Sequence, residues 1–352
     1  MHPLLEKYFS LIKRFLPKSS AANAVGLDIG AGECKLVEIV RSGDQFQVLR
    51  WEIAPIREGD VLRTIRALLE NLSSPCKTLY TAVVGKGTLI RYIDMPKMTL
   101  QDMKSSFNVE ADKYFPFAQE HIYTDCFILE EQDKGKTMAV MAAAAKKELI
   151  DPRVKLISEL GLQANFIGIN AIALANIVNV LGYDGEKDFK DKAVAILDLG
   201  DSVSSLMILI NKVPRFTRDI FVGGRDLTKR ISNALAISFE QAEALKNNPG
   251  ERLEEIIKVT ELAVVNIVKE LRLSFDYFVT EKNCPIQKLL LTGGGALLEG
   301  LPAAFEKNLE ISVSLWDPLA SLVATTAKGG DNVQKKSLRM GVALGLALYG
   351  YD

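Results

Sequence analysis

Two short turns, each at the end of an apolar strand, contain residue types that can bind a phosphate and its metal ion. The first turn contains Asp28 and Gly30, and the second contains Asp198 and Gly200. Each tight turn joins two strands, so that its backbone N–H groups can converge on an anion. A carboxylate fixed beside such donors is costly unless a cation is shared, and hydrated Mg²⁺ on a nucleotide suits this place. The two turns therefore predict a pair of phosphate-binding hairpins.

A run of three glycines follows a third apolar strand, at 288–291. Glycine allows a ligand to approach the backbone where a Cβ atom would collide with it. Gly293, Gly294 and Gly295 could therefore form the surface against which a nucleoside lies. The order of the three motifs predicts a nucleotide site in which one hairpin from each half of the chain holds the phosphates.

Each motif is a weak indication when it stands alone, because Asp-x-Gly turns and Gly-Gly pairs are common in loops. Residues 30–35 lack the Gly-x-x-x-x-Gly-Lys spacing of a P-loop. They also fail the dinucleotide-binding pattern, since Lys35 stands at the third glycine and a strand rather than a helix follows. The prediction therefore depends on the order and separation of all three motifs.

The composition indicates a globular chain without a basic surface. Its 352 residues are enough to bury a large core, in one two-lobed domain or in two domains. A net charge of −1 gives no electrostatic reason to expect nucleic-acid binding. The four cysteines are scattered, which favours buried thiols in a reducing compartment over a disulfide framework. No segment resembles a membrane-spanning helix or a secretory signal, so we expect a cytosolic chain.

Hydrophobic periodicity predicts the elements that must position these motifs. The first half reads as three strands, a helix and two strands, then a helix that Thr99 caps and Pro116 ends. Two strands, a helix, a strand and a helix complete this half. The second half repeats the scheme. It begins with a strand pair at 193–210 and a strand at 213–220, and helices follow after residues 223 and 238. A long helix at 251–280, the strand before the glycines and helices at 301–308 and 339–349 complete it. This repeat predicts an α/β fold of two lobes, each with a mixed β-sheet flanked by helices.

The same patterns predict the domain organisation. Residues 1–24 read as a basic amphipathic helix followed by a linker. The helix either binds an anionic membrane or a partner's groove, or packs on the body of the protein. Lobe one is expected at 25–185, with an inserted helix-and-hairpin subdomain at about 95–150. Lobe two is expected at 186–352, with the region that contacts the base at about 225–285 and a last helix that packs back on the body.

The motif set resembles that of the actin-like ATPase superfamily and, within it, the FtsA-like PilM family of type IV pilus assembly proteins. The inserted segment carries the second part of this resemblance. It contains Glu110-Ala111-Asp112-Lys113-Tyr114-Phe115-Pro116-Phe117, which is similar to the family signature Glu-Ala-x-x-Tyr-Ile-Pro-Phe. The resemblance extends from about residue 25 to residue 350. It implies an actin-like ATPase fold that binds ATP and Mg²⁺ between two lobes.

Residue by residue, the resemblance implies a nucleotide-binding set in which Asp28 and Asp198 hold Mg²⁺ through water. Two departures from the family pattern bear on activity. Ala31 and Gly32 stand where a serine or threonine often contacts the phosphates, and Asn170 stands where relatives have an acidic residue. Asn170 is a candidate to orient water but is not a base, so we expect slow or absent hydrolysis and assign no other catalytic residue. The implied nucleotide contacts are Asp28, Gly30, Ala31, Gly32, Lys35, Asp198, Gly200, Asp201, Ser202, Gly224, Glu243, Lys246, Gly293, Gly294 and Gly295.

The resemblance also implies a protein partner. Members of the family dock the N-terminal cytoplasmic tail of a PilN-like inner-membrane protein in a groove beside the inserted subdomain, where Tyr114, Phe115 and Phe117 supply aromatic surface in this chain. The expected role is an ATP-binding cytoplasmic scaffold at the inner-membrane face of the pilus platform. Other platform proteins, assembly ATPases and further copies of the chain are additional candidate partners. The alternative is an FtsA-like polymerising protein associated with the membrane. A sugar kinase fits less well, because neither a catalytic aspartate for a hydroxyl substrate nor a sugar-binding insertion is found.

Overall fold

The computed structural model describes residues 23–43, 45–131, 136–183, 189–323 and 336–351. The amphipathic segment expected at 1–24 therefore lies outside the described residues, apart from its last two positions. Within the described ranges, no helix is long and apolar enough to cross a membrane.

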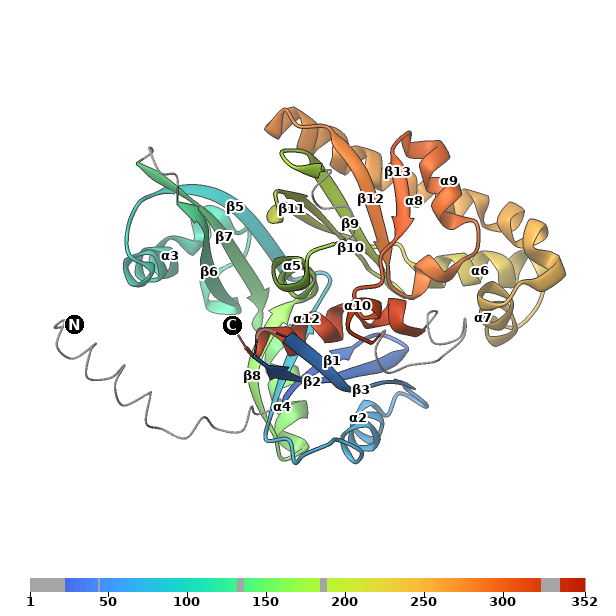
Figure 1. The fold of residues 1–352 in the computed structure, drawn as a ribbon, viewed down its shortest axis with the longest axis horizontal. Helices are drawn as coiled ribbons and strands as arrows, with labels where there is room; N and C mark the ends of the chain where they lie inside the picture. Colours follow the sequence, from blue (N-terminus) through green and yellow to red (C-terminus); the bar gives the residue numbers. More distant parts are fainter. Residues whose placement is uncertain (1–22, 44, 132–135, 184–188, 324–335, 352) are drawn as a thin grey trace.

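Two five-stranded sheets with the same strand order form the body of the molecule (Figure 1). In each, three antiparallel strands come first in the sequence, and two parallel strands are added beside the first of them. This repeat confirms the predicted α/β fold of two lobes. The first sheet has the order β3-β2-β1-β4-β8 and contains β1 (Ala24–Ile29), β2 (Glu33–Ser42), β3 (Gln45–Pro55), β4 (Thr78–Val83) and β8 (Gln163–Ile169). The second has the order β11-β10-β9-β12-β13 and contains β9 (Ala193–Leu199), β10 (Ser204–Ile210), β11 (Val213–Ile220), β12 (Ile286–Thr292) and β13 (Ser312–Leu315).

The sequence patterns do not predict strand β13. It is four residues long, and Val313 is its one buried residue. So short a pattern cannot be told from a loop by periodicity. The strand pairs in parallel with β12, from Lys288 opposite Ser312 onwards, and it completes the correspondence between the two sheets.

A third sheet of three antiparallel strands stands beside lobe one, at the upper left of Figure 1. It has the order β5-β7-β6 and consists of β5 (Thr88–Pro96), β6 (Ile122–Glu131) and β7 (Thr137–Lys146). Helix α3 (Leu100–Tyr114) covers one face of this inserted sheet. Thr99 caps α3 as the sequence predicts, because its hydroxyl accepts a hydrogen bond from Asp102 N at 3.1 Å. The opposite face of the sheet packs on Ile169 and Ala171 of lobe one.

The remaining helices flank the two large sheets. The long helix begins two residues later than predicted, because Glu251 belongs to a 3₁₀ turn, Gly250–Arg252, that precedes it. Ser238 caps the helix that precedes the long helix, at Phe239–Asn247, as predicted. Gln241 N donates a hydrogen bond to Ser238 Oγ at 3.2 Å. The helices are α2 (Val61–Leu69), α4 (Lys147–Glu159), α5 (Asn170–Leu181), α6 (Gly224–Leu235), α7 (Phe239–Asn247), α8 (Leu253–Lys282), α9 (Leu301–Leu309), α10 (Ala320–Val323) and α12 (Gly341–Tyr349).

Helix α12 crosses the centre of the molecule beside α5 (Figure 1). Its residues 341–348 are all buried. Two glycines allow the backbones to touch: a Cβ atom on Gly26 of β1 would lie 2.0 Å from Ala343 O, and one on Gly345 of α12 would lie 2.0 Å from Ala173 O of α5. Close backbone contact therefore holds the end of the chain against lobe one.

Candidate functional site

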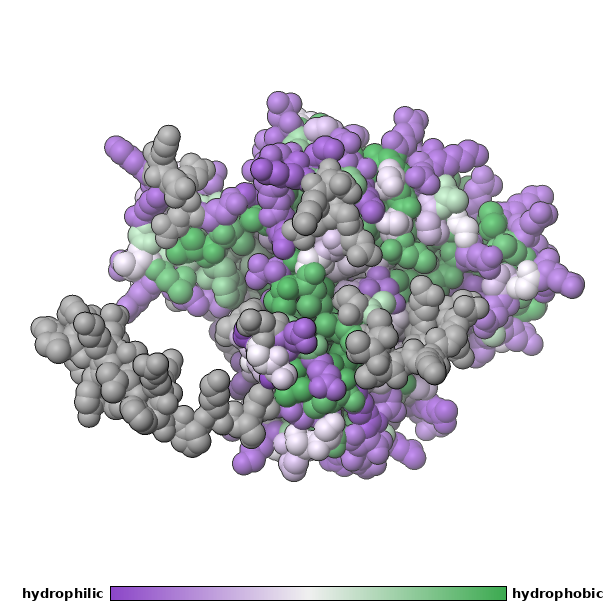
Figure 2. Space-filling model, viewed as in Figure 1, coloured by the Kyte–Doolittle hydropathy of each residue, from purple (hydrophilic) through white to green (hydrophobic). Residues whose placement is uncertain are grey.

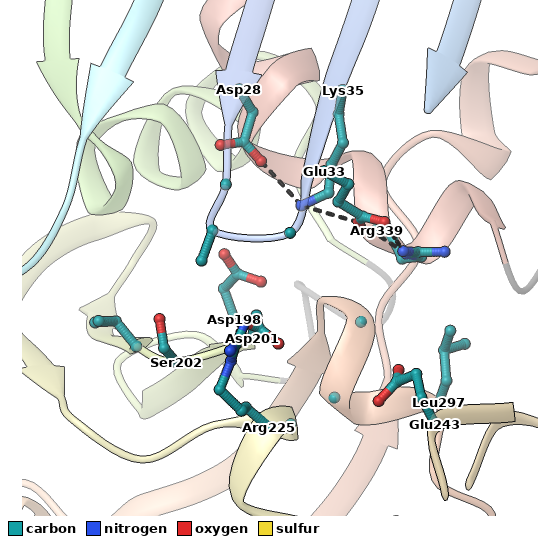
Figure 3. Close-up of a pocket in the computed structure, with 18 of the residues that line it drawn as sticks. Asp28, Glu33, Lys35, Asp198, Asp201, Ser202, Arg225, Glu243, Leu297 and Arg339 are labelled. Carbon is teal, nitrogen blue, oxygen red and sulfur yellow. Dashed lines mark hydrogen bonds and ion pairs between the residues drawn. The ribbon is translucent and has the colours of Figure 1, made fainter. Parts of the chain in front are cut away.

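A cavity of about 570 Å³ opens between the two lobes, and the predicted nucleotide contacts gather around it (Figure 3). The β1–β2 hairpin faces the cavity from lobe one, and the β9–β10 hairpin faces it from lobe two. Asn170, the first residue of α5, also lies on the wall. All of the predicted contacts except Gly293 line the cavity, namely Asp28, Gly30, Ala31, Gly32, Lys35, Asp198, Gly200, Asp201, Ser202, Gly224, Glu243, Lys246, Gly294 and Gly295.

Gly293 supports the site from behind its wall. Its φ is +89°, and a Cβ atom there would lie 2.2 Å from Asp198 Oδ1. Only glycine therefore allows the turn after β12 to pass so close to the second hairpin. We conclude that the structure places Gly293 where it positions Asp198 rather than where it lines the cavity.

In the first hairpin, Asp28 and Lys35 face each other. They are directly opposite in the β1–β2 register, and Lys35 Nζ donates a hydrogen bond to Asp28 Oδ2 at 3.0 Å. Lys35 Nζ also lies 3.6 Å from Glu33 Oε1. Gly30 N closes the turn by donating to Glu33 O at 3.0 Å. The hairpin thus presents a carboxylate and an ammonium group together at the cavity.

In the second hairpin, the backbone holds the start of α6. Gly200 O accepts a hydrogen bond from Gly224 N, and Asp201 O accepts one from Arg225 N, both at 2.8 Å. The Arg225 side chain returns to the same turn, where its Nε donates to Asp201 Oδ2 at 2.8 Å. The Gly200 and Asp201 carbonyls satisfy the first N–H groups of α6, which have no partner within the helix. The N-terminus of α6 is therefore fixed beside the second hairpin, on the cavity wall.

One ammonium group is shared between two carboxylates at the cavity floor. Burial raises the pKa of Asp198 to about 6, an effect that Lys35 opposes and Asp28 increases. Burial alone would lower the pKa of Lys35, but the charges of Asp28 and Asp198 outweigh it and hold that pKa above its usual value. The floor therefore carries negative charge that a further cation would neutralise.

These residues fit a hydrated Mg²⁺ held together with a nucleotide. Mg²⁺ keeps several waters and takes one or two carboxylates together with phosphate oxygens. Asp28 and Asp198 supply two carboxylates, and the part of the chain that the structure describes has no group of three or more acidic, His or Cys side chains for a metal site built from protein alone. A Cβ atom on Gly32 would meet nothing within 4 Å, so that the first hairpin leaves open space beside it.

On another wall of the cavity, Lys246 joins α7 to α6. The residue is 4% exposed, and its Nζ donates to Gly224 O at 3.2 Å, Thr228 Oγ1 at 2.8 Å and Glu243 Oε2 at 2.7 Å. Burial alone would raise the pKa of Glu243, but Lys246 and further hydrogen bonds hold it below the usual value. The side chain of Glu243 is the more exposed of the pair, so it is the one available to a ligand, while Lys246 secures the wall.

Other residues on the cavity wall were not predicted. Arg339, just before α12, forms an ion pair with Glu33 of the first hairpin (Figure 3). Nothing in the local sequence indicates this pair, because its members are 306 positions apart and meet only in the folded chain. Arg225 follows the predicted Gly224 directly and could have been included for that reason. Phe239 and Leu297 add apolar surface of the kind that the flat face of a base requires.

Away from the cavity wall, Asp219 of β11 connects lobe two to the segment between β4 and β5. Its Oδ2 accepts hydrogen bonds from Gly85 N at 3.0 Å and Thr88 Oγ1 at 3.3 Å, and its Oδ1 accepts one from Ser205 Oγ at 3.0 Å. Burial raises the pKa of Asp219, and these hydrogen bonds offset part of the rise. This half-buried carboxylate is therefore hydrogen-bonded to both halves of the molecule.

The three aromatic residues expected at a partner groove lie at the end of α3. Phe115 is 3% exposed, and its ring packs edge-on against Phe107, with centroids 5.8 Å apart. Tyr114 stacks on the same Phe107 ring at 5.4 Å, and Phe117 is partly buried against the same cluster. The structure thus places all three rings in or against the core of the inserted subdomain.

Comparison with known proteins gives matches along the chain. The family model described as "Type IV pilus assembly protein PilM" matches residues 26–351. The cell division protein FtsA of Enterococcus faecalis (strain ATCC 700802 / V583) is 27% identical over 195 residues, which are 49% of this chain and 43% of the relative. FtsA of Enterococcus hirae is 26% identical over 187 residues, or 47% of this chain and 41% of the relative. The aligned region thus spans less than half the length of these curated relatives.

Solved structures show the same fold. A chain of a PilM-PilN type IV pilus biogenesis complex superposes with a TM-score of 0.81 at 24% identity, over 96% of this chain and 100% of that one. The ethanolamine utilization protein EutJ from Carboxydothermus hydrogenoformans superposes with a TM-score of 0.52 at 15% identity, over 97% and 98%. The actin-like ATPase fold predicted from the sequence is confirmed by these likenesses, with the third sheet as an addition to the two lobes.

Proposed function

Since the chain belongs to the PilM family of type IV pilus assembly proteins, we propose that it is an ATP-binding scaffold of the pilus platform at the cytoplasmic face of the inner membrane. In this proposal lobe one, at 25–185 with its insertion at about 95–150, and lobe two, at 186–352, hold Mg²⁺–ATP between them. Bound Mg²⁺–ATP would supply a polyphosphate and a metal ion that contact both lobes.

One observation carries the nucleotide part of the proposal: each lobe contributes one Asp–Gly hairpin to the same cavity. A ligand changes the relative position of two bodies only if it binds their arrangements with different affinities. Asp28 and Asp198 lie on separate lobes, so a ligand that needs both carboxylates binds the closed arrangement more tightly. The scaffold would therefore change shape with nucleotide occupancy.

Alanine substitutions test this placement. We expect Asp28→Ala and Asp198→Ala each to lower the affinity for Mg²⁺–ATP at least about tenfold, because a hydrogen bond to a charged group contributes about 1.5–3 kcal/mol. Isothermal titration calorimetry measures the affinity, and circular dichroism checks the fold. Asp112→Ala, at an exposed position of α3, is the matched control and should bind as the wild type does. Wild-type affinity in both cavity variants would remove the nucleotide from this cavity.

We further propose that turnover is slow or absent. The other carboxylates on the cavity wall are already engaged: Glu33 with Arg339, Asp201 with Arg225, and Glu243 with Lys246. Asn170 lacks the basicity to activate water. Steady-state phosphate release should lie at least tenfold below a typical enzyme rate of about 10 s⁻¹. A rate at or above that typical value from the purified chain would contradict the scaffold assignment.

For the partner, we propose the N-terminal tail of a PilN-like inner-membrane protein, held at the seam between the inserted sheet and lobe one. Figure 2 supports this place, because it shows hydrophobic surface on the inserted sheet and again over the neighbouring α5. In this seam the partly buried side chains of Phe127, Leu129 and Ile172 pack on the buried cluster that joins the inserted sheet to Ile169 and Ala171. An extended tail with apolar side chains could occupy such a seam. The wider role, with other platform proteins and assembly ATPases, rests on family membership.

Removal of the inserted subdomain tests the partner site. Lys146 N donates to Gly87 O at 2.8 Å, so residues 88–145 can be replaced by a short Gly-Ser linker without separating these ends. The shortened chain should lose binding of a synthetic PilN-like tail peptide and retain Mg²⁺–ATP binding, which shows that the rest is folded. Leu129→Glu should weaken the peptide at least about tenfold, whereas Val109→Glu, at an exposed position of α3, should not. Full peptide affinity in the shortened chain would contradict the proposed seam.

A further inference from the structure

A second groove, of about 720 Å³, lies between the inserted sheet and lobe two. One wall consists of β5 and the turn before it, and the other consists of β11 and the C-terminal part of α8, residues 273–282. Strands β5 and β11 face each other there in the upper half of Figure 1. The groove shares no lining residue with the nucleotide cavity, and it lies on the opposite side of β5 from the other strands of the inserted sheet.

The groove exposes large apolar side chains. Leu273 and Tyr277 of α8 are 52% and 56% exposed, and Phe221, just after β11, is 49% exposed. All three line the groove. Exposed apolar residues that gather along one groove, rather than standing singly on the surface, are typical of a binding site.

The groove is also rich in positive charge. Its lining contains five cationic side chains and two carboxylates. Arg215 and Arg218 are paired within the chain, with Glu130 and Glu270. Arg91 and Lys282 have no ion-pair partner among the residues that the structure describes, and Lys86 lies over the Phe221 ring at 5.5 Å. Lys86, Arg91 and Lys282 outnumber the two carboxylates of the lining, Asp219 and Glu281, so the remaining charge favours an acidic ligand.

Strand edges define the shape of that ligand. Strand β5 is at one end of the inserted sheet, and β11 is at one end of the second large sheet. Among the described residues no backbone hydrogen bond joins these two strands, so each presents one row of N–H and C=O groups that no strand completes. An extended segment can add to such an edge through main-chain hydrogen bonds, while pockets accept every second side chain.

We propose that this groove binds an extended, acidic peptide segment of a partner protein, in which carboxylates alternate with apolar side chains. The apolar side chains contact Leu273, Tyr277 and Phe221, and the carboxylates on the other face pair with Arg91 and Lys282. A single-stranded nucleic acid also combines negative charge with stacking rings. The groove favours the peptide, because it offers strand edges to which a peptide backbone can add and a nucleic-acid backbone cannot.

Fluorescence anisotropy tests this proposal on the full chain without nucleotide. The probe is a fluorescein-labelled peptide, Glu-Val-Glu-Leu-Glu-Val-Glu-Phe, and the comparison probes are the same peptide with lysine in place of glutamate and an oligothymidylate of similar length. The acidic peptide should bind at least about tenfold more tightly than either. The double variant Arg91→Glu, Lys282→Glu should lose at least about tenfold in affinity for it, and Tyr277→Ser should weaken it as well. Lys258→Glu, at an exposed position of α8 outside the groove, is the matched control and should bind as the wild type does.

Three results would overturn the proposal: equal affinity for the acidic and basic peptides, tighter binding of the oligothymidylate, or an unchanged affinity in the double variant. Competition with the PilN-like tail peptide separates this groove from the partner seam proposed above. The unlabelled tail should not displace the acidic probe. Displacement would show that both peptides bind the same site. Loss of tail binding or of ATP binding would leave the acidic-peptide result standing, so that the two proposals fail independently.

Discussion

At the scale of single residues, the charges at the cavity floor explain why this site needs a ligand that carries a metal ion. Lys35 forms its hydrogen bond with Asp28, at 3.0 Å, and lies 3.6 Å from Glu33, whereas Asp198 acts on it through its charge without a hydrogen bond between them. Asp198 is left with burial as the largest influence on its pKa. Asp198 is half-buried on the cavity wall, where desolvation makes its negative charge costly, and a metal ion beside it would reduce that cost when the ligand is bound.

This cost predicts that Asp198 contributes to the pH dependence of stability. Its pKa is about 6 in the folded chain, against about 3.9 for an unfolded aspartate. Between these values the Asp198 carboxyl binds more protons in the folded state than in the unfolded state, so its contribution to the stability of the wild type falls as pH rises and levels off above the folded pKa. Asp198→Asn cannot lose this proton. Its stability relative to the wild type should therefore increase from about pH 4 to about pH 7, measured by urea unfolding in EDTA without nucleotide. A constant difference over that range would contradict the prediction.

Lys246, unlike Asp198, should stabilise the folded chain. Its ammonium group is buried, and all three of its hydrogen bonds are formed within the chain. Lys246→Ala leaves Gly224 O, Thr228 Oγ1 and Glu243 without their shared donor. We expect a loss of about 1–3 kcal/mol in the free energy of unfolding, because three hydrogen bonds from a charged group are lost, although Thr228 Oγ1 can still donate to Gly224 O or Glu243. Lys258→Ala, exposed on α8, should stay within about 0.5 kcal/mol of the wild type. Chemical denaturation measures both, and equal stability of the two variants would show that α7 does not depend on Lys246.

A site residue could be predicted when a local motif sets its position, and could not when contacts between distant segments set it. Asp28 and Asp198 each lie in a short motif, where a strand and a following glycine suffice to place the carboxylate. Gly293 lies in such a motif as well, but its distance from Asp198 depends on how β12 packs beside β9, which the motif does not contain. The Glu33–Arg339 ion pair depends on the contact of distant segments, and no local pattern could indicate it.

At the scale of elements, α12 connects the two halves through contacts that have no room for a side chain. A Cβ atom on Gly345 would lie 2.0 Å from Ala173 O, a backbone atom that cannot rotate away. Gly345→Ala should therefore displace α12 from α5 and cost about 3 kcal/mol or more, at the upper end of the usual effect of overpacking. Gly32→Ala is the matched control, because its added Cβ would meet nothing within 4 Å. Thermal unfolding without nucleotide measures both, and a Gly345→Ala variant as stable as Gly32→Ala would show that α12 can shift freely.

The elements themselves were predictable where their own periodicity was long enough. Thr99 and Ser238 mark two helix starts, because a capping side chain acts within the first turn and needs no distant contact. Strand β13 is too short for such a signal, and it becomes a strand because β12 offers an open edge beside it. The 3₁₀ turn that contains Glu251 likewise reflects the local chain path rather than the apolar stripe of α8.

At the scale of the whole molecule, the repeated strand order was readable as a weak repetition of the pattern in each half. The relation of the inserted sheet to lobe two was not. The sequence patterns predict the insertion as part of lobe one, and the inserted sheet packs on that lobe through Ile169 and Ala171. In the structure, β5 also lies beside β11 of lobe two. This contact arises only when both lobes and the insertion are assembled.

That arrangement predicts coupling between the nucleotide cavity and the groove between β5 and β11. The groove has walls from both halves of the molecule, and Asp219 bonds β11 to Gly85 and Thr88 at its base. If Mg²⁺–ATP closes the lobes, the spacing of these walls changes. The affinity of the acidic probe peptide should then change at least about fivefold when Mg²⁺–ATP is bound, in the usual range of coupling between sites. By linkage the peptide must change the affinity for Mg²⁺–ATP by the same factor.

Asp219→Ala should reduce both factors together, whereas Asp112→Ala on α3 should change neither. Factors of one in both titrations of the wild type would show that the cavity and the groove act independently.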